Sequence, residues 1–344
     1  MTRSFVWHVF HPAPTIIPFF LPFAGCPFHC LYCAQDLVTG EVSSPPLSFR
    51  FESLRAALDV RRLRGQTPPH LAFYGGTFTA LPEADFAFCL DAGQDLLERG
   101  LISGLRCSTR PDALCAERLK RLQASGFTLI ELGIQSFDEA ALAKTCRGYG
   151  KEQAEGACRM VREAGFALGV QLLPGMPGVT ARVFLRDVRK ALAFSPSCLR
   201  FYPCLVLAGT GLARLWQQGR YRPWDLATTL ATLAHGYLLA QDAAVSVIRM
   251  GLAPQGDLLQ HLLAGPWHPA LGARVMARAL YLAVVRELAG ARLLALRLPR
   301  ALQGFCFGEK GEMRSFWQRL GLAPSAIRFG AYGQVEMDLA GKRF

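Results

Sequence analysis

The sequence predicts an α/β fold: a partial parallel (β/α) barrel followed by a small α+β module near the C-terminal end. Short apolar, strand-like runs recur along most of the chain, and amphipathic segments of helical length separate them. Strands that alternate with helices form crossover units, and such units build parallel sheets. The alternation stops after residue 255, where one long helix and a short segment of different character follow.

Each expected strand is a short apolar run bounded by turn residues. About seven such strands suit a full or partial barrel better than a short open sheet. The segments 82–100 and 151–166 show amphipathic helical patterns, and 270–288 is expected to form one helix. The expected strands are 16–24, 70–76, 101–109, 127–135, 166–175, 198–206 and 245–251.

Three motifs directly follow expected strands. A cysteine-rich segment follows the first strand, Gly-Gly-Thr at 75–77 follows the second, and Pro-Gly-Met-Pro-Gly at 174–178 follows the fifth. The C-terminal ends of parallel barrel strands meet at one edge, where active sites of such barrels lie. The sequence therefore predicts that the three motifs share one site.

Composition indicates a globular chain with an acidic partner. Of 344 residues, 51% are hydrophobic and 19% are charged, which allows a large core. The net charge of +12 suggests a partner such as nucleic acid. The excess of arginine over lysine, however, can also come from GC-rich coding. The apolar run at 15–25 is too short to span a membrane, and no signal-peptide cleavage pattern precedes the cysteines, so a cytoplasmic location is expected. In that location the eleven cysteines are expected to be mostly reduced thiols.

Cys26, Cys30 and Cys33 form a CxxxCxxC motif inside eight residues. Thiolates at this spacing wrap a loop around a metal centre. Zinc usually takes four ligands from two pairs, and no second pair follows downstream. Three thiolates suit a 4Fe–4S cluster that keeps one iron open to an outside ligand. The alternative is a chance group of core thiols. Core filling is the role expected for nearly all of the other eight cysteines, with a redox role at Cys204 as an alternative.

The motif, with Tyr32 just before its last cysteine, resembles the radical S-adenosylmethionine (radical SAM) superfamily, and the resemblance covers about residues 14–255. It implies a barrel of the radical SAM type with two cofactors, a 4Fe–4S cluster and SAM. In that superfamily the amino and carboxylate groups of SAM bind the open iron. An electron from the reduced cluster then cleaves SAM to a 5′-deoxyadenosyl radical. An electron donor such as a flavodoxin or ferredoxin is implied as a partner.

Further motifs narrow the resemblance to one branch of the superfamily. These segments together are similar to the branch that contains the catalytic subunit of Elongator, which modifies the wobble uridine of tRNA. The oxygen-independent coproporphyrinogen oxidase is a more distant relative. The motifs are FYGGTFTAL (73–81), STRPD (108–112), ELGIQSFD (131–138), RGY (147–149), PGMPG (174–178) and FYPCLVLAGTGLARLW (201–216).

The resemblance assigns the glycine motif to the SAM amine. Gly75 and Gly76 would let backbone carbonyls approach that amine, because a side chain would obstruct it. Many members carry an acid after the glycines, and Thr77 stands there in this chain. A plain strand-to-helix turn is the alternative for the two glycines.

Four further SAM contacts follow from position in the resembling motifs. Gln135 matches a family glutamine, and Arg147 matches the arginine that pairs with the SAM carboxylate. Gln171 stands where an aspartate binds the ribose hydroxyls, and Ser108 where an acid is expected. A solvated helix arginine is the alternative for Arg147. We assign no catalytic residue from the sequence.

The segment after the barrel resembles a KH domain. Leu294, Leu296 and Leu298 alternate as in a strand, Pro299 ends it, and a short helix, the loop 308–311 and a second helix are expected to follow. In KH folds the GxxG loop clamps the sugar-phosphate backbone. This resemblance names Gly308, Lys310 and Gly311 as nucleic-acid contacts. Glu309 and Glu312 argue against it, because carboxylates repel phosphate.

The expected organisation is a barrel at 1–255, a helical connector at 256–290 and a KH-like module at 291–344. No glycine-rich acyl-CoA loop follows the barrel, so the acetyltransferase domain of the Elongator branch is not expected there.

The favoured hypothesis is a radical SAM enzyme that modifies a structured RNA such as tRNA. The alternatives are oxidation or rearrangement of a small anionic molecule such as a tetrapyrrole, and a non-enzymatic carrier of a cluster or haem. Arg200 and Arg249, on the last two strands, are candidate contacts to an acidic substrate.

Overall fold

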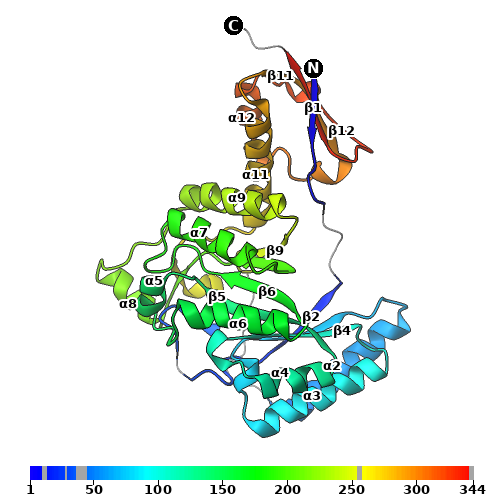
Figure 1. Ribbon diagram of the computed structural model, residues 1–344, viewed down its shortest axis with the longest axis vertical. Helices are drawn as coiled ribbons and strands as arrows, with labels where there is room; N and C mark the ends of the chain where they lie inside the picture. The colour runs from blue at the N-terminus through cyan, green and yellow to red at the C-terminus, as the bar shows by residue number, and fades with distance from the viewer. Residues whose placement is uncertain (10–13, 28, 36–44, 254–257, 341–344) are drawn as a thin grey trace.

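A large parallel sheet and a small mixed sheet form the two ends of the protein in the computed structural model (Figure 1). The structure describes residues 1–9, 14–27, 29–35, 45–253 and 258–340. Within these ranges no helix is long and apolar enough to cross a membrane.

The large sheet contains seven parallel strands in the order β2-β3-β4-β5-β6-β7-β9. The order of the strands in the sheet is therefore the same as their order in the sequence. All seven expected strands are confirmed, most of them over shorter ranges. The sheet curls into a barrel that is only partial. Its edge strands, β2 and β9, do not pair with each other, so the ring of strands stays open. The strands are β2 (Ile16–Phe20), β3 (His70–Tyr74), β4 (Gly104–Thr109), β5 (Phe127–Gln135), β6 (Ala167–Leu172), β7 (Cys198–Phe201) and β9 (Ser246–Met250).

Helices connect the strands and cover the outer face of the sheet (Figure 1). The expected amphipathic helices at 82–100 and 151–166 are confirmed as α3 and α6. Central strands such as β5 are buried on both faces, as is usual for parallel sheets. The helices of the barrel are α2 (Leu47–Leu63), α3 (Glu83–Glu98), α4 (Ala116–Ala124), α5 (Glu139–Lys144), α6 (Lys151–Glu163), α7 (Ala181–Leu192), α8 (Gly211–Gln217) and α9 (Leu226–Asp242).

A long helix leads from the barrel to the small sheet. This helix, α11 (Leu271–Leu288), confirms the helix expected at 270–288 and packs against α9. Before it, α10 (Leu258–His261) is followed by β10 (Leu262–Ala264), which pairs antiparallel with β8 (Val206–Leu207).

The small sheet has the strand order β1-β13-β11-β12. Its strands are β1 (Thr2–Phe5), β11 (Arg292–Pro299), β12 (Ile327–Gly330) and β13 (Val335–Ala340). The pairing of β1 with β13 departs from the sequence-based division, which grouped residues 1–255 with the barrel. The first strand of the chain therefore completes the C-terminal module.

The alternation expected in β11 is wrong at its start. Leu293 is buried, whereas Leu294 is 49% exposed, because the register shifts between Leu293 and Ala295. Such an irregularity moves the following side chains to the opposite face of the strand. Beyond it, Leu296 and Leu298 are buried as expected.

The helices of the KH-like pattern are short. The expected first helix is a single 3-10 turn at Arg300–Leu302, and the 308–311 loop contains another 3-10 turn, Glu309–Gly311. The second helix is confirmed as α12 (Arg314–Arg319), which buries Trp317. The KH-like assignment stays a prediction.

A buried carboxylate fastens α7 to the end of β5. Asp187 is 1% exposed and accepts hydrogen bonds from Ser136 Oγ at 2.5 Å and from Phe137 N at 3.1 Å. Ser136 and Phe137 directly follow Gln135, so this contact helps to fix the C-terminal end of the central strand. Burial raises the pKa of Asp187 from its ordinary value of 3.8 to about 6.

This shift makes the effect of Asp187→Asn depend on pH. The folded state binds the Asp187 proton more tightly than the unfolded state, so its contribution to stability is present below about pH 4 and is lost as the pH rises through about 6. Relative to Asp187→Asn, the wild-type protein should lose about 3 kcal/mol of unfolding free energy across that window. Urea unfolding between pH 4 and 7.5 checks this. A constant difference between the two proteins would contradict it.

Candidate active site

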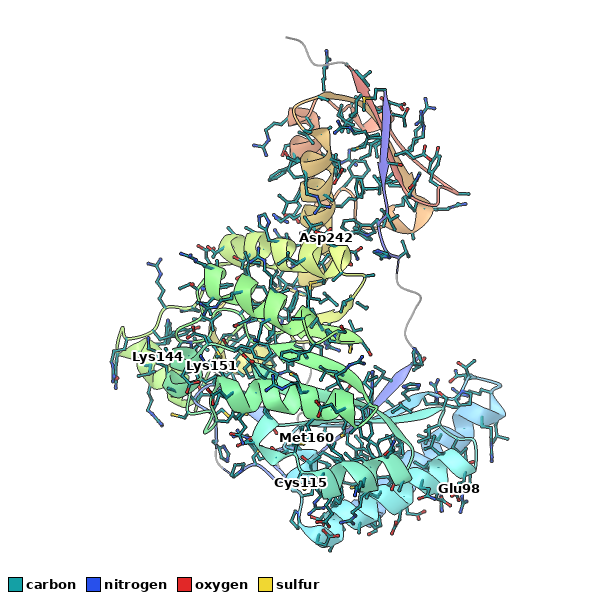
Figure 2. The ribbon with its side chains drawn as sticks, viewed as in Figure 1. Glu98, Cys115, Lys144, Lys151, Met160 and Asp242 are labelled. Carbon is teal, nitrogen blue, oxygen red and sulfur yellow. The ribbon has the colours of Figure 1, made fainter. Side chains whose placement is uncertain are left out.

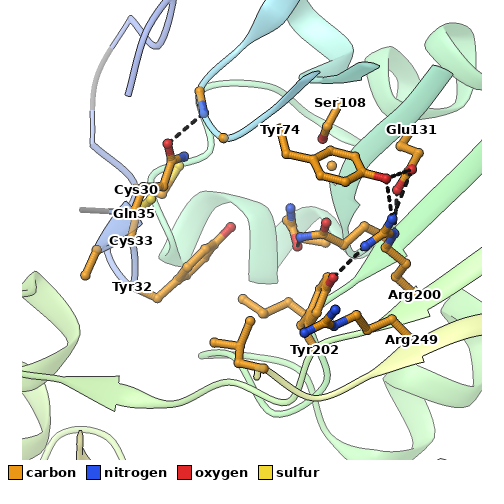
Figure 3. Close-up of a pocket in the computed structure, with 18 of the residues that line it drawn as sticks. Cys30, Tyr32, Cys33, Gln35, Tyr74, Ser108, Glu131, Arg200, Tyr202 and Arg249 are labelled. Atoms are coloured by element: carbon orange, nitrogen blue, oxygen red, sulfur yellow. Dashed lines mark hydrogen bonds and ion pairs between the residues drawn. The ribbon is translucent and has the colours of Figure 1, made fainter. Parts of the chain in front are cut away.

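A cavity of about 470 Å³ opens at the C-terminal ends of the large sheet's strands. Cys26, Cys30 and Cys33 line it, so the three thiols share one site as expected. Figure 3 shows Cys30 and Cys33 on one side of this cavity, with Tyr74, Glu131, Arg200, Tyr202 and Arg249 on the other. Six of the seven residues predicted to contact SAM also line it: Gly75, Gly76, Ser108, Gln135, Arg147 and Gln171.

The seventh predicted residue, Thr77, is buried behind the cavity wall. Its Oγ1 lies 3.2 Å from Cys26 Sγ, so it supports a cysteine. Its backbone N donates to Ala24 O at 2.7 Å. Thr77 therefore ties the end of β3 to the cysteine loop.

The cysteine loop lies directly against the glycine motif. Gly75 and Gly76 have φ values of +77° and +56°, which favour glycine. A Cβ on Gly76 would lie 2.2 Å from Ala24 O and 2.6 Å from Leu21 O. Gln35 Oε1 accepts hydrogen bonds from Gly76 N and Phe23 N, each at 2.6 Å. The missing side chain at Gly76 thus lets two segments of backbone touch.

Burial keeps two of the thiols protonated in the absence of metal. It raises the pKa of Cys33 to about 12 and also raises the pKa of Cys26. A metal ion must displace these protons, so iron binding is coupled to proton release. Of the other cysteines, Cys115 and Cys146 are exposed and the remaining six are buried. Five of these six lie outside the cavity lining and fill the core, whereas Cys204 lines the cavity.

Arg147 is 5% exposed, so the alternative of a solvated helix arginine is wrong. Its Nη1 donates to Cys30 Sγ at 3.0 Å and its Nη2 donates to Gly133 O at 2.7 Å. Tyr149 Oη accepts from Arg147 Nε at 3.0 Å. Arg110 Nη1 lies 3.5 Å from the same Cys30 sulfur. Two buried guanidinium groups therefore face one candidate iron ligand.

Two amide side chains meet beside these arginines. Gln135 ends β5 with a φ of +66°, and its Oε1 lies 3.4 Å from Gln171 Nε2 on the neighbouring strand β6. This weak contact leaves polar atoms of both residues on the cavity wall. Ser108, on β4, is half-buried on the same wall.

The sequence analysis missed a polar network on the other side of the cavity. Glu131 is 3% exposed, and its carboxylate lies 2.5 Å from Arg200 Nε. Tyr74 Oη donates to Glu131 Oε1 at 2.6 Å, and Arg200 Nη1 donates to Tyr202 Oη at 2.9 Å. A charged residue inside the apolar run of β5 was the signal that pointed to this network.

The donor set consists of three cysteine thiols, which are the ligands that iron–sulfur clusters use. Among the described residues, no group of three His, Cys, Asp or Glu side chains is arranged to hold one metal ion. The ligands of a cluster bind separate irons, so they need to line one cavity without converging on a point. Cys26, Cys30 and Cys33 meet that requirement.

Comparison with known proteins identifies related sequences over most of the chain. Residues 20–191 match the family described as the radical SAM superfamily, and residues 196–280 match the radical SAM C-terminal domain. Elongator complex protein 3 of Mus musculus is 31% identical over 185 residues, which cover 46% of this chain and 33% of that protein. The tRNA uridine(34) acetyltransferase of Methanocaldococcus infernus is 27% identical over 239 residues, or 58% of this chain and 45% of that protein.

A solved structure supports the fold. The structure of archaeal Elp3 from Methanocaldococcus infernus, with an N-terminal deletion, matches with a TM-score of 0.60 and 21% identity, covering 79% of this chain and 63% of that one. The chain spans less than half the length of the two curated relatives. The resemblance to the radical SAM superfamily and to its Elongator branch is confirmed.

Replacing Cys30 with alanine should abolish the brown absorbance of the cluster and lower bound iron, because the remaining two thiols cannot hold a 4Fe–4S cluster. Anaerobic reconstitution followed by visible spectroscopy and iron analysis checks this. Cys89→Ala is the matched control, since Cys89 is a fully buried thiol of α3 outside the cavity lining. Equal iron content in the two variants would contradict the assignment.

Gly76→Ala should displace the cysteine loop, because the new Cβ would overlap the Ala24 carbonyl. We expect a large loss of iron and sulfide from the reconstituted protein. Gly100→Ala is the matched control: Gly100 has a φ of +65°, but a Cβ there meets nothing within 4 Å. That control should lose about 1–2 kcal/mol of stability from backbone strain and keep its cluster. Full cluster content in Gly76→Ala would refute the role of this contact.

Proposed function

The chain belongs to the radical SAM superfamily, whose members use a 4Fe–4S cluster and SAM, and we propose that it cleaves SAM reductively to modify a structured RNA such as tRNA. The observation that carries the proposal is one cavity lined by the three cysteines and by six of the seven residues expected to contact SAM.

In this proposal Cys26, Cys30 and Cys33 hold the cluster. When bound, the cluster and SAM supply an electron-driven carbon–sulfur cleavage that yields a radical able to abstract a hydrogen atom. Arg147 and Arg110 stabilise the negative charge of the Cys30 thiolate, since both are buried and both donate toward its sulfur.

The remaining polar groups of the cavity wall orient SAM. Gly75 and Gly76 offer backbone atoms without side-chain obstruction, and Gln135, Gln171 and Ser108 offer hydrogen-bonding atoms. Arg147 is proposed to pair with the SAM carboxylate. That contact requires one of its donors to turn from the neighbours described above, or to be shared with them.

An RNA substrate is supported by the relatives and by charge. The archaeal relative is named as an enzyme acting on tRNA uridine 34, and the chain carries a net charge of +12. Acetyl transfer is not carried over to this chain, because the matched region covers less than half of that relative. A reductant such as a flavodoxin or ferredoxin and a cytoplasmic location remain part of the proposal.

The 308–311 loop is proposed as an additional RNA contact through Gly308, Lys310 and Gly311. The carboxylates that argued against this role are neutralised within the protein. Glu312 forms ion pairs with Arg274 at 2.7 Å and Arg278 at 3.0 Å, both on α11. Glu309 lies 3.9 Å from Arg274 Nε and 3.0 Å from His268 Nε2, while Lys310 is exposed. The loop can therefore present a cation toward phosphate.

The test is anaerobic SAM cleavage with and without total tRNA. We expect reconstituted protein with dithionite and SAM to form 5′-deoxyadenosine faster when tRNA is present, because substrate binding completes the site. Liquid chromatography quantifies the product. Cleavage indifferent to tRNA would keep the radical enzyme and favour a small anionic substrate. An intact cluster without cleavage would favour a carrier.

The same assay separates the 308–311 loop from the cavity. Lys310→Glu should weaken tRNA binding several-fold and leave tRNA-independent cleavage unchanged, because the loop lies outside the cavity lining. Lys120→Glu is the matched control, since Lys120 is an exposed lysine of α4. Equal tRNA affinity in both variants would remove the loop from the proposal.

A further inference from the structure

We propose that the side of the cavity opposite the cysteines is an oxyanion subsite, in which Arg249 binds a phosphate or carboxylate group of the substrate. The inference rests on the proposed function in one respect: the ligand is the molecule whose reaction occurs in this cavity. Its chemical basis is an excess of positive charge on this side, together with one arginine that has no partner among the described residues.

The charges at the two sides of the cavity are balanced differently. On the cysteine side, Arg110 forms an ion pair with Asp112 at 2.7 Å, and Arg147 faces the Cys30 sulfur. Thiolates of a bound cluster add further negative charge there. The positive charges on this side therefore have anionic partners within the protein or its cofactor.

On the opposite side, two buried arginines share one carboxylate. Arg200 and Arg106 are 9% and 6% exposed, and Glu131 lies 2.5 Å and 3.7 Å from their respective Nε atoms. Among the described residues that line the cavity, Glu131 is the only acidic one. Buried charge without a partner is costly, so this group of side chains favours an additional anion nearby.

Arg249 adds a third positive charge at the same place. It is the register partner of Arg200 on the neighbouring parallel strand, so both side chains leave the sheet on the cavity face. Arg249 is exposed, and no hydrogen bond or ion pair to it is found in the described part of the chain. Figure 3 shows it beside Tyr202, without a dashed line to any neighbour.

Arg200 holds its place but has little capacity for a ligand. Its donors reach Tyr202 Oη, Tyr74 Oη and Glu131. The planar guanidinium of Arg249, in contrast, can offer two parallel N–H groups to two oxygens of one phosphate or carboxylate. Arg200, Arg106 and Glu131 thus supply a net positive charge next to the ligand. Arg249 is the residue that contacts the ligand directly.

The neighbouring wall suits an organic anion. Ile16, Pro18 and Phe20 from β2, and Ile248 and Leu252 at the other edge of the sheet, line the same cavity. These apolar side chains can cover a ring or carbon chain attached to the anionic group. A nucleotide of an RNA and a small carboxylated co-substrate both have this chemistry.

Binding of small probes tests the subsite without turnover. Reconstituted protein with SAM and no reductant is titrated calorimetrically with uridine 5′-monophosphate, uridine and succinate. We expect the wild-type protein to bind the monophosphate or succinate at least tenfold more tightly than uridine. Arg249→Gln should lose this preference, and Arg249→Lys should keep part of it. Arg182→Gln, which removes an exposed arginine of α7, should behave as the wild type.

The outcomes separate the subsite from the proposed function. A tenfold preference for the monophosphate that Arg249→Gln removes supports a nucleotide phosphate as the ligand. The same loss for succinate alone supports the subsite with a carboxylate ligand and weakens the RNA proposal. Equal binding of all three probes by the wild-type protein, including no measurable binding, overturns the subsite. An anion preference that the Arg249→Gln variant retains also overturns the subsite. This outcome does not depend on whether tRNA stimulates SAM cleavage.

Discussion

The close contact between the end of β3 and the cysteine loop is the constraint on which the site depends. Three hydrogen bonds join the two segments. Two are between backbone groups, from Leu21 N to Tyr74 O and from Thr77 N to Ala24 O, each at 2.7 Å, and in the third Gly76 N donates to the side-chain Oε1 of Gln35 at 2.6 Å. The close approach at Gly76 is possible because this residue has no Cβ, which would overlap the Ala24 and Leu21 carbonyls. This contact holds the cysteine loop against the end of β3, so the loop forms one wall of the cavity.

The charges of the cavity follow from the parallel order of the strands. The parallel strands end at the same edge of the sheet, so Glu131 of β5 and Arg200 of β7 line the same cavity as Arg147, which follows α5, although the three residues are far apart in the chain. The result is an uneven distribution in which thiolates are matched by arginines on one side and a net positive group lies on the other. The electrostatic potential therefore differs between the two sides. A cationic sulfonium is favoured near the thiolates, and an anionic substrate is favoured near the arginines.

The sequence predicted the elements that depend on local pattern and on motif. All seven strands of the large sheet, the helix at 270–288 and the three cysteines were expected, because period, composition and spacing are local properties. The contacts that the sequence missed are long-range. The pairing of β1 with β13 joins residues 330 or more positions apart, and nothing in the short segment Thr2–Phe5 identifies its partner. Leu294 was misplaced because one irregularity in register reverses a strand's faces. Glu131 was visible as a charge in an apolar strand, but its partners come from three other strands.

Helix α11 joins the C-terminal module to the barrel, and its arginines also form ion pairs with Glu312 beside the 308–311 loop. One part of α11 packs against α9 of the barrel, and Arg274 and Arg278 of α11 hold Glu312 next to the 308–311 loop. Paired arginines lower the pKa of Glu312 to about 2 against the opposing effect of burial, so this carboxylate stays ionised near neutral pH. The loop is consequently held to a helix that also packs against the barrel. Figure 2 shows side chains on both the barrel and the C-terminal module, with Asp242 at the end of α9 labelled. A nucleic acid bound at Lys310 would therefore contact a surface whose position relative to the cavity is set by packing, which is the arrangement that an enzyme acting on one nucleotide of a large RNA requires.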